Sequence, residues 1–270
     1  MRSSRIGRWA AAAVVPAFAV LSLTVGPRFL EDVMGIGTDE VAGSAAFAGA
    51  WKAGLDEDSP LVSIRLDVLP GARAGEKGAT VLSATRDTVC SGRATVKSRS
   101  EDTLVLGGFD MRRIGPGATS GSYACGLPAT MKLVSDPHGG IMWEPAALTS
   151  VEVDRALPAS VQVPDAFLGE WYASRGSLQV TVRRGAAGSL AVHGVDERDG
   201  RHCEWEAALL DVGRRTIATT GAHVIKEESD AACASANHAY LYDIEGSGDT
   251  ATLSRHSDAE PDALTLRRRP

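Results

Sequence analysis

The chain has 270 residues, of which 44% are hydrophobic, 23% charged and 5% aromatic. This composition is typical of a globular protein, excludes a disordered or fibrous chain, and the length allows one large or two modest domains. The formal net charge is −6, but residues 1–30 contain four arginines and no acidic residue, which leaves 24 basic and 34 acidic residues after them. A body with a net charge of −10 is a poor match for nucleic acid, whose phosphates need a basic surface.

The N-terminus predicts a membrane segment. Residues 9–27 form an uncharged stretch of 19 residues, preceded by three arginines and followed by Glu31 and Asp32. As a helix this stretch spans about 28 Å at ~1.5 Å per residue, close to the ~30 Å of a hydrocarbon layer. We therefore expect a cytoplasmic basic tail at 1–8, a single transmembrane signal-anchor at 9–26, and the body of the chain outside the cell membrane.

A cleaved signal peptide is the alternative. Ala17-Phe18-Ala19 has the small-x-small form of a cleavage site, and residues 9–16 supply a short apolar core before it. Cleavage there leaves the apolar segment 20–25 as the new N-terminus. Such a terminus is unusual, which favours the uncleaved anchor. In either case the body is exported, either tethered to the membrane or secreted.

The body contains an internal repeat. Phe47-x-Gly49-x-Trp51 recurs as Phe167-x-Gly169-x-Trp171, 120 residues later, and each copy continues with short runs of alternating apolar and polar residues. Period-two runs separated by Gly, Asp, Ser and Pro are typical of antiparallel strands. The expected strands are 61–68, 79–84, 94–97, 103–106, 130–134, 141–143 and 147–153 in the first copy, and 178–182, 189–195, 202–209, 216–219, 239–243, 250–254 and 263–267 in the second.

We therefore predict a mainly β protein with two tandem antiparallel domains, at 47–157 and 167–270. A spacer at 27–46 precedes them, and a proline-bounded linker at 158–166 joins them. About seven short strands in ~100 residues leave exposed sheet edges unless the sheet closes into a barrel or packs as a sandwich. The sequence leaves both architectures open.

One detail favours the barrel. The Gly-x-Trp at the head of each copy, with an arginine at or just after the last strand, resembles the closure signature of calycin-type barrels. The resemblance implies that a tryptophan packs across the barrel end and an arginine stacks over it, a contact worth ~1–2 kcal/mol when shielded from water. The candidate pairs are Trp51 with Arg155 and Trp171 with Arg267. The alternative is that each tryptophan is an ordinary core residue of a first strand.

The order of features also resembles a family. A basic tail, one membrane segment, Phe-x-Gly-x-Trp and alternating strands with a cysteine pair are similar to the extracytoplasmic β-domains of actinobacterial membrane proteins, including the ectodomains of receptor-type serine/threonine kinases. The resemblance covers residues 47–270 and implies a sensory or interaction role outside the membrane. The eight residues before Trp9 cannot hold the nucleotide loop, lysine and aspartate of a kinase, so we expect no kinase activity.

The four cysteines fall into two similar pairs. Cys90 and Cys125 are 35 residues apart, and Cys203 and Cys233 are 30 apart. In an exported protein this repetition predicts one disulfide in each domain. The competing interpretation is a zinc site in the second domain made by His202, Cys203, Cys233 and His238. The first domain has no corresponding histidines, which favours the disulfides.

Local catalytic motifs are absent from the sequence: it contains no Gly-x-Ser-x-Gly, His-Glu-x-x-His, P-loop or Cys-x-x-Cys. We therefore expect no catalytic residues, no metal and no cofactor, and a binding or sensing module whose ligand-binding residues are unknown. Its expected partner is a small molecule, a cell-wall fragment or an envelope protein, and not nucleic acid. The alternative function is an exported hydrolase that assembles carboxylates from distant parts of the chain.

Overall fold

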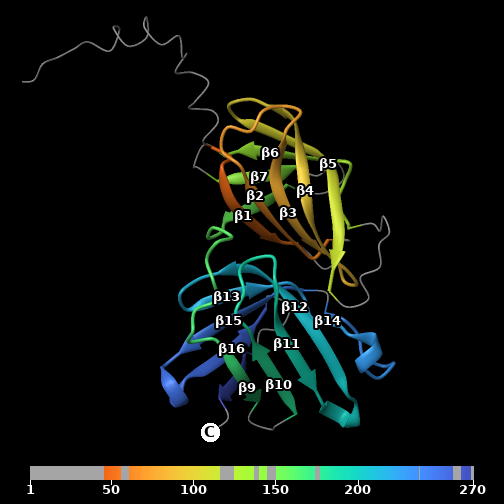
Figure 1. The fold of residues 1–270 in the computed structure, drawn as a ribbon, viewed down its shortest axis with the longest axis vertical. Coiled ribbons are helices and arrows are strands. Elements are labelled where there is room, and N and C mark those ends of the chain that lie inside the picture. The colour runs from red at the N-terminus through yellow and green to blue at the C-terminus, as the bar shows by residue number, and fades with distance from the viewer. Residues whose placement is uncertain are drawn as a thin grey trace, which may run out of the picture. The chain divides into compact units, whose positions relative to one another are not determined.

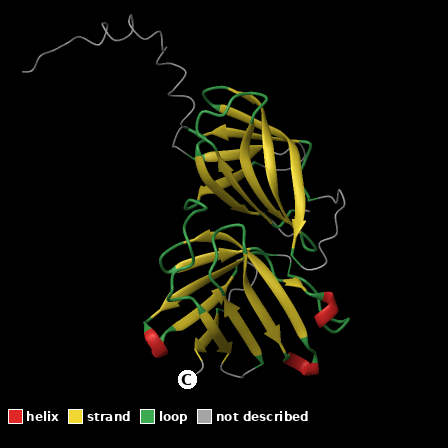
Figure 2. Ribbon diagram, viewed as in Figure 1, coloured by secondary structure: helices red, strands yellow, loops and turns green. Residues whose placement is uncertain are grey.

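The computed structural model describes residues 46–55, 61–115, 125–136, 140–144, 150–173, 177–236, 238–257 and 263–268. Strands dominate these residues, and the only helices among them are three short 3₁₀ turns, η1 (Arg198–Gly200), η2 (Lys226–Glu228) and η3 (Gly248–Thr250) (Figure 2). The predicted tail and anchor lie outside the described residues. Within the described part, no helix has both the length and the apolar character needed to cross a membrane.

The first eight strands form a closed barrel (Figure 1). Each strand pairs antiparallel with the next, and β8 returns to β1 through the partners Trp51 and Arg155. The strands are β1 (Gly49–Gly54), β2 (Ser63–Val68), β3 (Lys77–Ala84), β4 (Val89–Arg99), β5 (Thr103–Ile114), β6 (Thr130–Ser135), β7 (Ile141–Glu144) and β8 (Val151–Arg155).

The second barrel repeats this plan with one extra strand. It is closed by pairing of β9 with β17 and of β11 with β12. Its strands are β9 (Gly169–Ala173), β10 (Leu178–Val182), β11 (Leu190–Asp196), β12 (Cys203–Val212), β13 (Thr216–Thr219), β14 (His223–Val224), β15 (Tyr240–Glu245), β16 (Thr252–His256) and β17 (Leu264–Arg268). The prediction of a mainly β protein is thus confirmed, and both units are barrels rather than sandwiches.

The extra strand β14 interrupts the regular wall of the second barrel. It pairs with Trp205 and Glu206 of β12, on the same edge of β12 that β13 uses further along. The segment that follows η2 then runs beside β14: the amide of Val224 donates to Oγ of Ser235, and the amide of Ala236 donates to the carbonyl of Ala222. This stretch of wall is therefore made partly by irregular chain.

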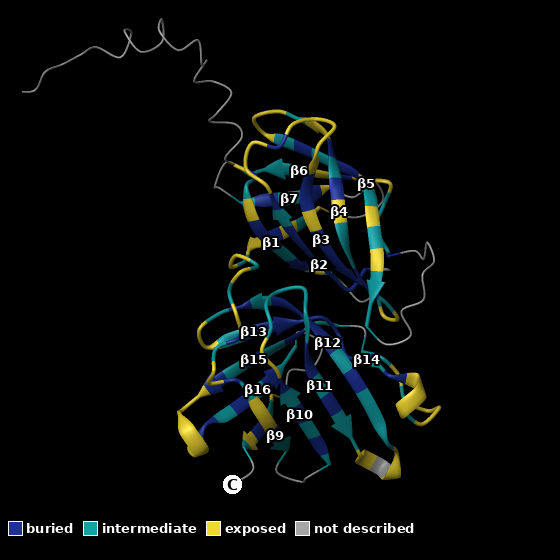
Figure 3. Ribbon diagram, viewed as in Figure 1, coloured by how far each residue is buried: buried dark blue, intermediate teal, exposed yellow. Residues whose placement is uncertain are grey.

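Period-two burial explains why these sequences form barrel strands. In β10, Leu178, Val180 and Val182 are buried while Gln179 and Thr181 are partly exposed, and β15 and β16 alternate in the same way (Figure 3). The inward side chains build a separate core in each barrel. Burial of apolar area at about 25 cal/mol per Å² is the main favourable contribution to each core.

A third apolar cluster joins the two barrels, which belong to one compact unit, Asp39–Pro270. It combines Leu82, Ala84 and Val89 with Ala208, Leu210 and Ala218. Beside it Arg65 is only 2% exposed: it pairs with the carboxylate of Asp67 at 2.7 Å and donates to the carbonyls of Leu210 at 2.6 Å and Leu157 at 2.7 Å. A buried guanidinium needs such partners, because an unpaired buried charge costs several kcal/mol.

The tryptophan–arginine contacts occur at both barrels, with one correction. The guanidinium of Arg155 lies 3.7 Å from the centre of the Trp51 ring. Over Trp171 the stacked residue is Arg268, at 4.7 Å, and not Arg267 as the sequence analysis expected. Leu266 is fully buried, so alternation turns Arg267 outward and brings Arg268 to the face of Trp171, its cross-strand partner.

Candidate functional site

The second barrel contains a cavity of about 460 Å³, which we call the barrel cavity. It lies where β11, β12, β14, β15 and β16 meet the irregular segment after η2. It is lined by Asp196, Arg198, Arg201, Cys203, Trp205, Ala222, Val224, Ala232, Cys233, Ala234, Ala236, His238, Tyr240 and Arg255.

Strand alternation explains why large side chains gather there. Along β16, Leu253 and Arg255 share the inward face, so an arginine takes a core position and is 8% exposed. Its guanidinium lies 4.5 Å from the ring centre of Tyr240, a cation–π contact, and the ring of His238 meets Tyr240 edge-on at 4.8 Å.

Trp205 forms another wall of the cavity because its partner strand has a glycine. Gly194 faces Trp205 across the β11–β12 ladder, and a Cβ atom at Gly194 would lie only 2.0 Å from the indole. Any larger residue would therefore displace the ring. The tryptophan is 5% exposed and belongs to the core of the second barrel.

Charged side chains line part of the barrel cavity. Asp196 is the one carboxylate among the described lining residues, against Arg198, Arg201 and Arg255. Burial by itself raises the pKa of Asp196, but hydrogen bonds from Arg198 and the positive charges of Arg198 and Arg255 outweigh it and hold that pKa below its usual value. Asp196 therefore stays ionised at neutral pH and is a poor proton donor.

A disulfide forms part of the cavity lining. Cys203 and Cys233 are bonded, as are Cys90 and Cys125 in the first barrel, with Cα–Cα distances of 5.7 and 5.8 Å. These are the two pairs that the repeat predicts. The zinc alternative at His202, Cys203, Cys233 and His238 is wrong, because both of its sulfur ligands are consumed by the disulfide. No metal-ligating cluster occurs among the described residues.

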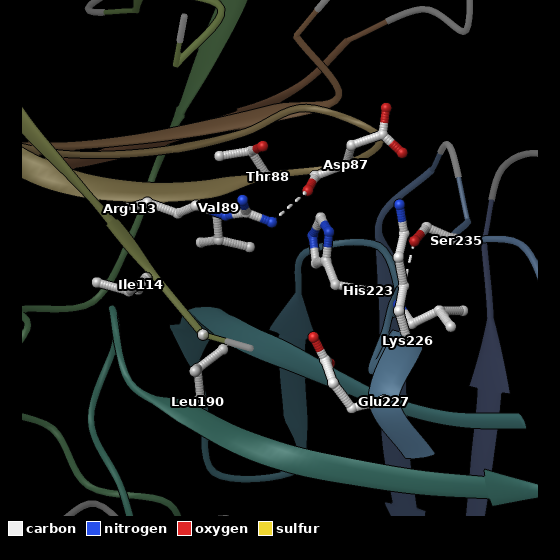
Figure 4. A pocket seen from close by; sticks show the side chains of 12 residues that line it. Asp87, Thr88, Val89, Arg113, Ile114, Leu190, His223, Lys226, Glu227 and Ser235 are labelled. Carbon is white, nitrogen blue, oxygen red and sulfur yellow. Dashed lines mark hydrogen bonds between the residues drawn. The ribbon is translucent and has the colours of Figure 1, made fainter. Parts of the chain in front are cut away.

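A second cavity, also about 460 Å³, lies beside the junction and contains His223 (Figure 4). His223 stands at the centre of this view, with Arg113 and Asp87 from the first barrel above it and Lys226 and Glu227 from the second around it. It is 7% exposed, and neither ring nitrogen has a well-formed hydrogen bond to a described residue.

Burial dominates the chemistry of this histidine. It lowers the pKa of His223 to about 4; the charge of Asp87 opposes the shift, the charge of Arg113 adds to it, and the backbone of Arg86 opposes it weakly. His223 is therefore neutral at pH 7. The charged side chains among the described lining residues are two cations and two anions, so this lining favours neither sign of ligand.

A cluster of glutamate and histidine side chains lies outside the wall of the second barrel. Glu204 on β12 contacts His202 at 3.0 Å and His193 at 3.2 Å, and His202 also contacts Glu197 at 2.9 Å. Burial tends to raise the pKa of Glu204, but hydrogen bonds from its neighbours lower it overall, whereas the hydrogen bond with Glu204 raises the pKa of Glu228.

Of the residues predicted from sequence, Cys203 and Cys233 line the barrel cavity, whereas Cys90, Cys125, Trp51, Arg155 and Trp171 do not. The lining residues Trp205, Tyr240 and Arg255 were not identified from sequence. Alternation through Leu253 and Arg255 was the available signal, because it puts an arginine on the apolar face of a strand. Comparison of the chain with protein-family models, curated proteins and solved structures finds no match.

Proposed function

We propose that this protein is a membrane-anchored, extracytoplasmic binding or sensing module without catalytic activity, and that it holds a small molecule in the barrel cavity. The observation that carries the proposal is a 460 Å³ cavity lined by a buried arginine and two aromatic side chains. Small-molecule sites are typically concave and mostly apolar, with a few placed polar groups. The interior of a closed eight-stranded barrel is either filled by side chains or holds one small ligand.

Two further features support this reading. The tryptophan and arginine at each barrel end fit the calycin-type closure. The architecture of a calycin-type barrel is suited to ligand binding at its open end. Two disulfides favour an oxidising compartment, in agreement with an exported body. The proposed anchor at 9–26 would keep the module at the membrane surface.

The alternative function is the exported hydrolase. The polar group at Glu204 favours it more than any other described feature, because Glu228 with its raised pKa is a candidate acid and Glu204 with its lowered pKa a candidate base. This group lies outside the barrel cavity, and Asp196 inside the cavity is held ionised by Arg198. The binding role is therefore the better supported of the two.

Full-length protein screened with muropeptides, glycosides and peptides for both turnover and thermal stabilisation tests the proposal. We expect saturable stabilisation without turnover. Ala234→Trp, at an exposed position that lines the cavity, should weaken binding at least tenfold. Ala231→Trp is the matched control, since Ala231 is exposed and is not a lining residue. Turnover that Glu204→Gln or Glu228→Gln abolishes would overturn the proposal and establish the hydrolase.

A further inference from the structure

We propose that the loop between β11 and β12, residues 197–202, is a pH-sensitive rim of the barrel cavity. The imidazole of His202 holds this loop in place while it is protonated and releases it on losing that proton. Arg198 and Arg201 of the loop line the cavity, so release of the loop changes its opening. This consequence for ligand access rests on the proposed function, whereas the switch depends only on the contacts of His202.

Both ring nitrogens of His202 face carboxylate oxygens. Nδ1 lies 2.9 Å from Oε1 of Glu197, which precedes η1, and Nε2 lies 3.0 Å from Oε1 of Glu204 on β12. An ionised carboxylate can only accept hydrogen bonds, and a neutral imidazole has a single N–H to donate. Both contacts are therefore hydrogen bonds only in the imidazolium form, whose two N–H groups bridge the start of the loop to the strand.

The surroundings of this bridge favour a proton on His202. Hydrogen bonds with Glu197 and then with Glu204 raise the pKa of His202. Burial tends to raise the pKa of Glu204, but hydrogen bonds from His202 and other neighbours lower it overall, so this carboxylate stays ionised. His193 contacts Glu204 through Nε2 alone, at 3.2 Å, and a neutral ring can make that contact with its one N–H. His202 is thus the histidine whose contacts require the extra proton.

Further carboxylates approach the bridge from β12 and from the segment at η2. Asp230 accepts a hydrogen bond of 2.8 Å from the backbone amide of His202. Glu228 of η2 interacts with Glu204, and Glu206 further along β12 acts on Glu228. When His202 is neutral, these negative groups face one another without its positive charge. Repulsion between like charges then adds to the loss of one hydrogen bond.

The other contacts of the loop do not change near neutral pH. Asp196, whose pKa is held below its usual value, stays ionised and pairs with Arg198. The backbone amide of Glu197 donates to the carbonyl of Ser177 at 2.6 Å. His202 therefore supplies the support that varies with pH. Because its pKa is raised above the ordinary value of about 6.5, the bridge is complete below pH 6.5 and is lost as the pH rises through the higher pKa of the folded protein.

Two measurements on the full-length protein test the proposal. NMR titration of the His202 ring should give a pKa above 6.5 and, at pH 6, the ¹⁵N shifts of a doubly protonated imidazole. Trypsin cleavage after Arg201 reports opening of the loop, since proteolysis of a briefly opened segment follows the population of the open form. The cleavage rate of the wild type, divided by that of Glu197→Gln, should rise about threefold between pH 6.5 and pH 8.5.

Glu197→Gln is the informative variant because a carboxamide both donates and accepts hydrogen bonds. It can pair with either form of His202, so the loop should stay equally closed at both pH values and the pKa of His202 should fall. Division by its rate also cancels the pH dependence of trypsin itself. His202→Ala should be cleaved faster than Glu197→Gln at both pH values. Glu245→Gln, exposed at the end of β15, is the matched control and should behave as the wild type.

A His202 pKa of 6.5 or below would overturn the proposal. A constant ratio of the wild-type cleavage rate to that of Glu197→Gln would also overturn it. Neither measurement uses a ligand, so the pH-sensitive rim can fail while the binding function stands. Conversely, failure of every compound in the ligand screen would overturn the proposed function and leave the pH dependence of the loop intact.

Discussion

The indole nitrogen of Trp51 donates a hydrogen bond of 2.9 Å to the carbonyl oxygen of Phe47, four residues earlier. Trp171 makes the same bond to Phe167, at 2.8 Å. In both places the phenylalanine and tryptophan are essentially fully buried, and the intervening glycine has a positive φ, 114° at Gly49 and 113° at Gly169. The repeated motif therefore encodes one local structure, a bent entry that seats a tryptophan at the end of a barrel.

The two glycines provide a matched pair of substitutions. Gly49→Ala and Gly169→Ala should each destabilise the protein by about 1–3 kcal/mol, because an L-residue is strained at this φ. The loss should be larger for Gly49→Ala, since its Cβ would lie 2.6 Å from Nη1 of Arg155, whereas a Cβ at Gly169 meets nothing within 4 Å. Urea unfolding followed by tryptophan fluorescence measures both, and equal losses would contradict the role given to Arg155.

Substitutions of Arg268 and of its neighbour Arg267 test which of the two arginines stabilises the second barrel. Arg268 lies over Trp171 and donates to the carbonyl of Ala166 at 2.6 Å, while Arg267 is exposed. Arg268→Ala should lower the free energy of unfolding by about 1–2 kcal/mol and Arg267→Ala by less than about 0.5 kcal/mol. The prediction fails if Arg267→Ala proves the more damaging change.

Removal of the disulfide beside the barrel cavity should affect stability and binding together. The double change Cys203→Ser, Cys233→Ser opens a 30-residue loop and should cost about 3–4 kcal/mol on the chain-entropy model. It should also weaken ligand binding, because both cysteines line the cavity. The matched double change Cys90→Ser, Cys125→Ser should cost a similar amount of stability but leave the affinity of the remaining folded protein unchanged. Equal effects of the two on affinity would show that the disulfide does not shape the site.

His223 should make stability depend on pH below neutrality. Above pH 6.5 its imidazole is neutral in the folded and unfolded states alike. As the pH falls from 6.5 towards 4, the unfolded chain binds a proton that the buried ring does not, so the folded state loses stability in that window. The loss at pH 5 should be about 2 kcal/mol relative to pH 7.5.

Urea unfolding of the wild-type protein and of His223→Gln at pH 7.5, 6 and 5 measures this contribution. The variant should lose less stability than the wild type over this range, by about the amount that His223 accounts for. The comparison uses the difference between pH values, so a general cost of the substitution cancels. Identical pH dependence of the two proteins would show that the ring is protonated as readily when folded as when unfolded.

Strand positions could be predicted from sequence because they depend on local alternation. The expected runs 178–182 and 216–219 coincide with β10 and β13, five others fall inside longer strands, and the remaining seven overlap their strands but begin one to four residues too early. β14 was missed because two residues are too few for a periodic pattern. The prediction that Arg267 stacks on Trp171 was wrong for a different reason. A shift of one residue in β17 reverses which side chain faces the barrel, and only the register with β9 decides that shift.

The sequence by itself determined the mainly β class, the duplication and the pairing of cysteines, since each depends on spacing along one chain. It could not determine burial that arises between distant strands. In β2, Arg65 alternates with Ile64 and Leu66 and reads as a solvent-facing residue, but Leu210 and Leu157 cover it. The barrel cavity is of the same kind, because Trp205, Tyr240 and Arg255 come from three separate strands. Only closure of the sheet brings these three side chains together around one cavity. Their burial from water there limits what they can bind.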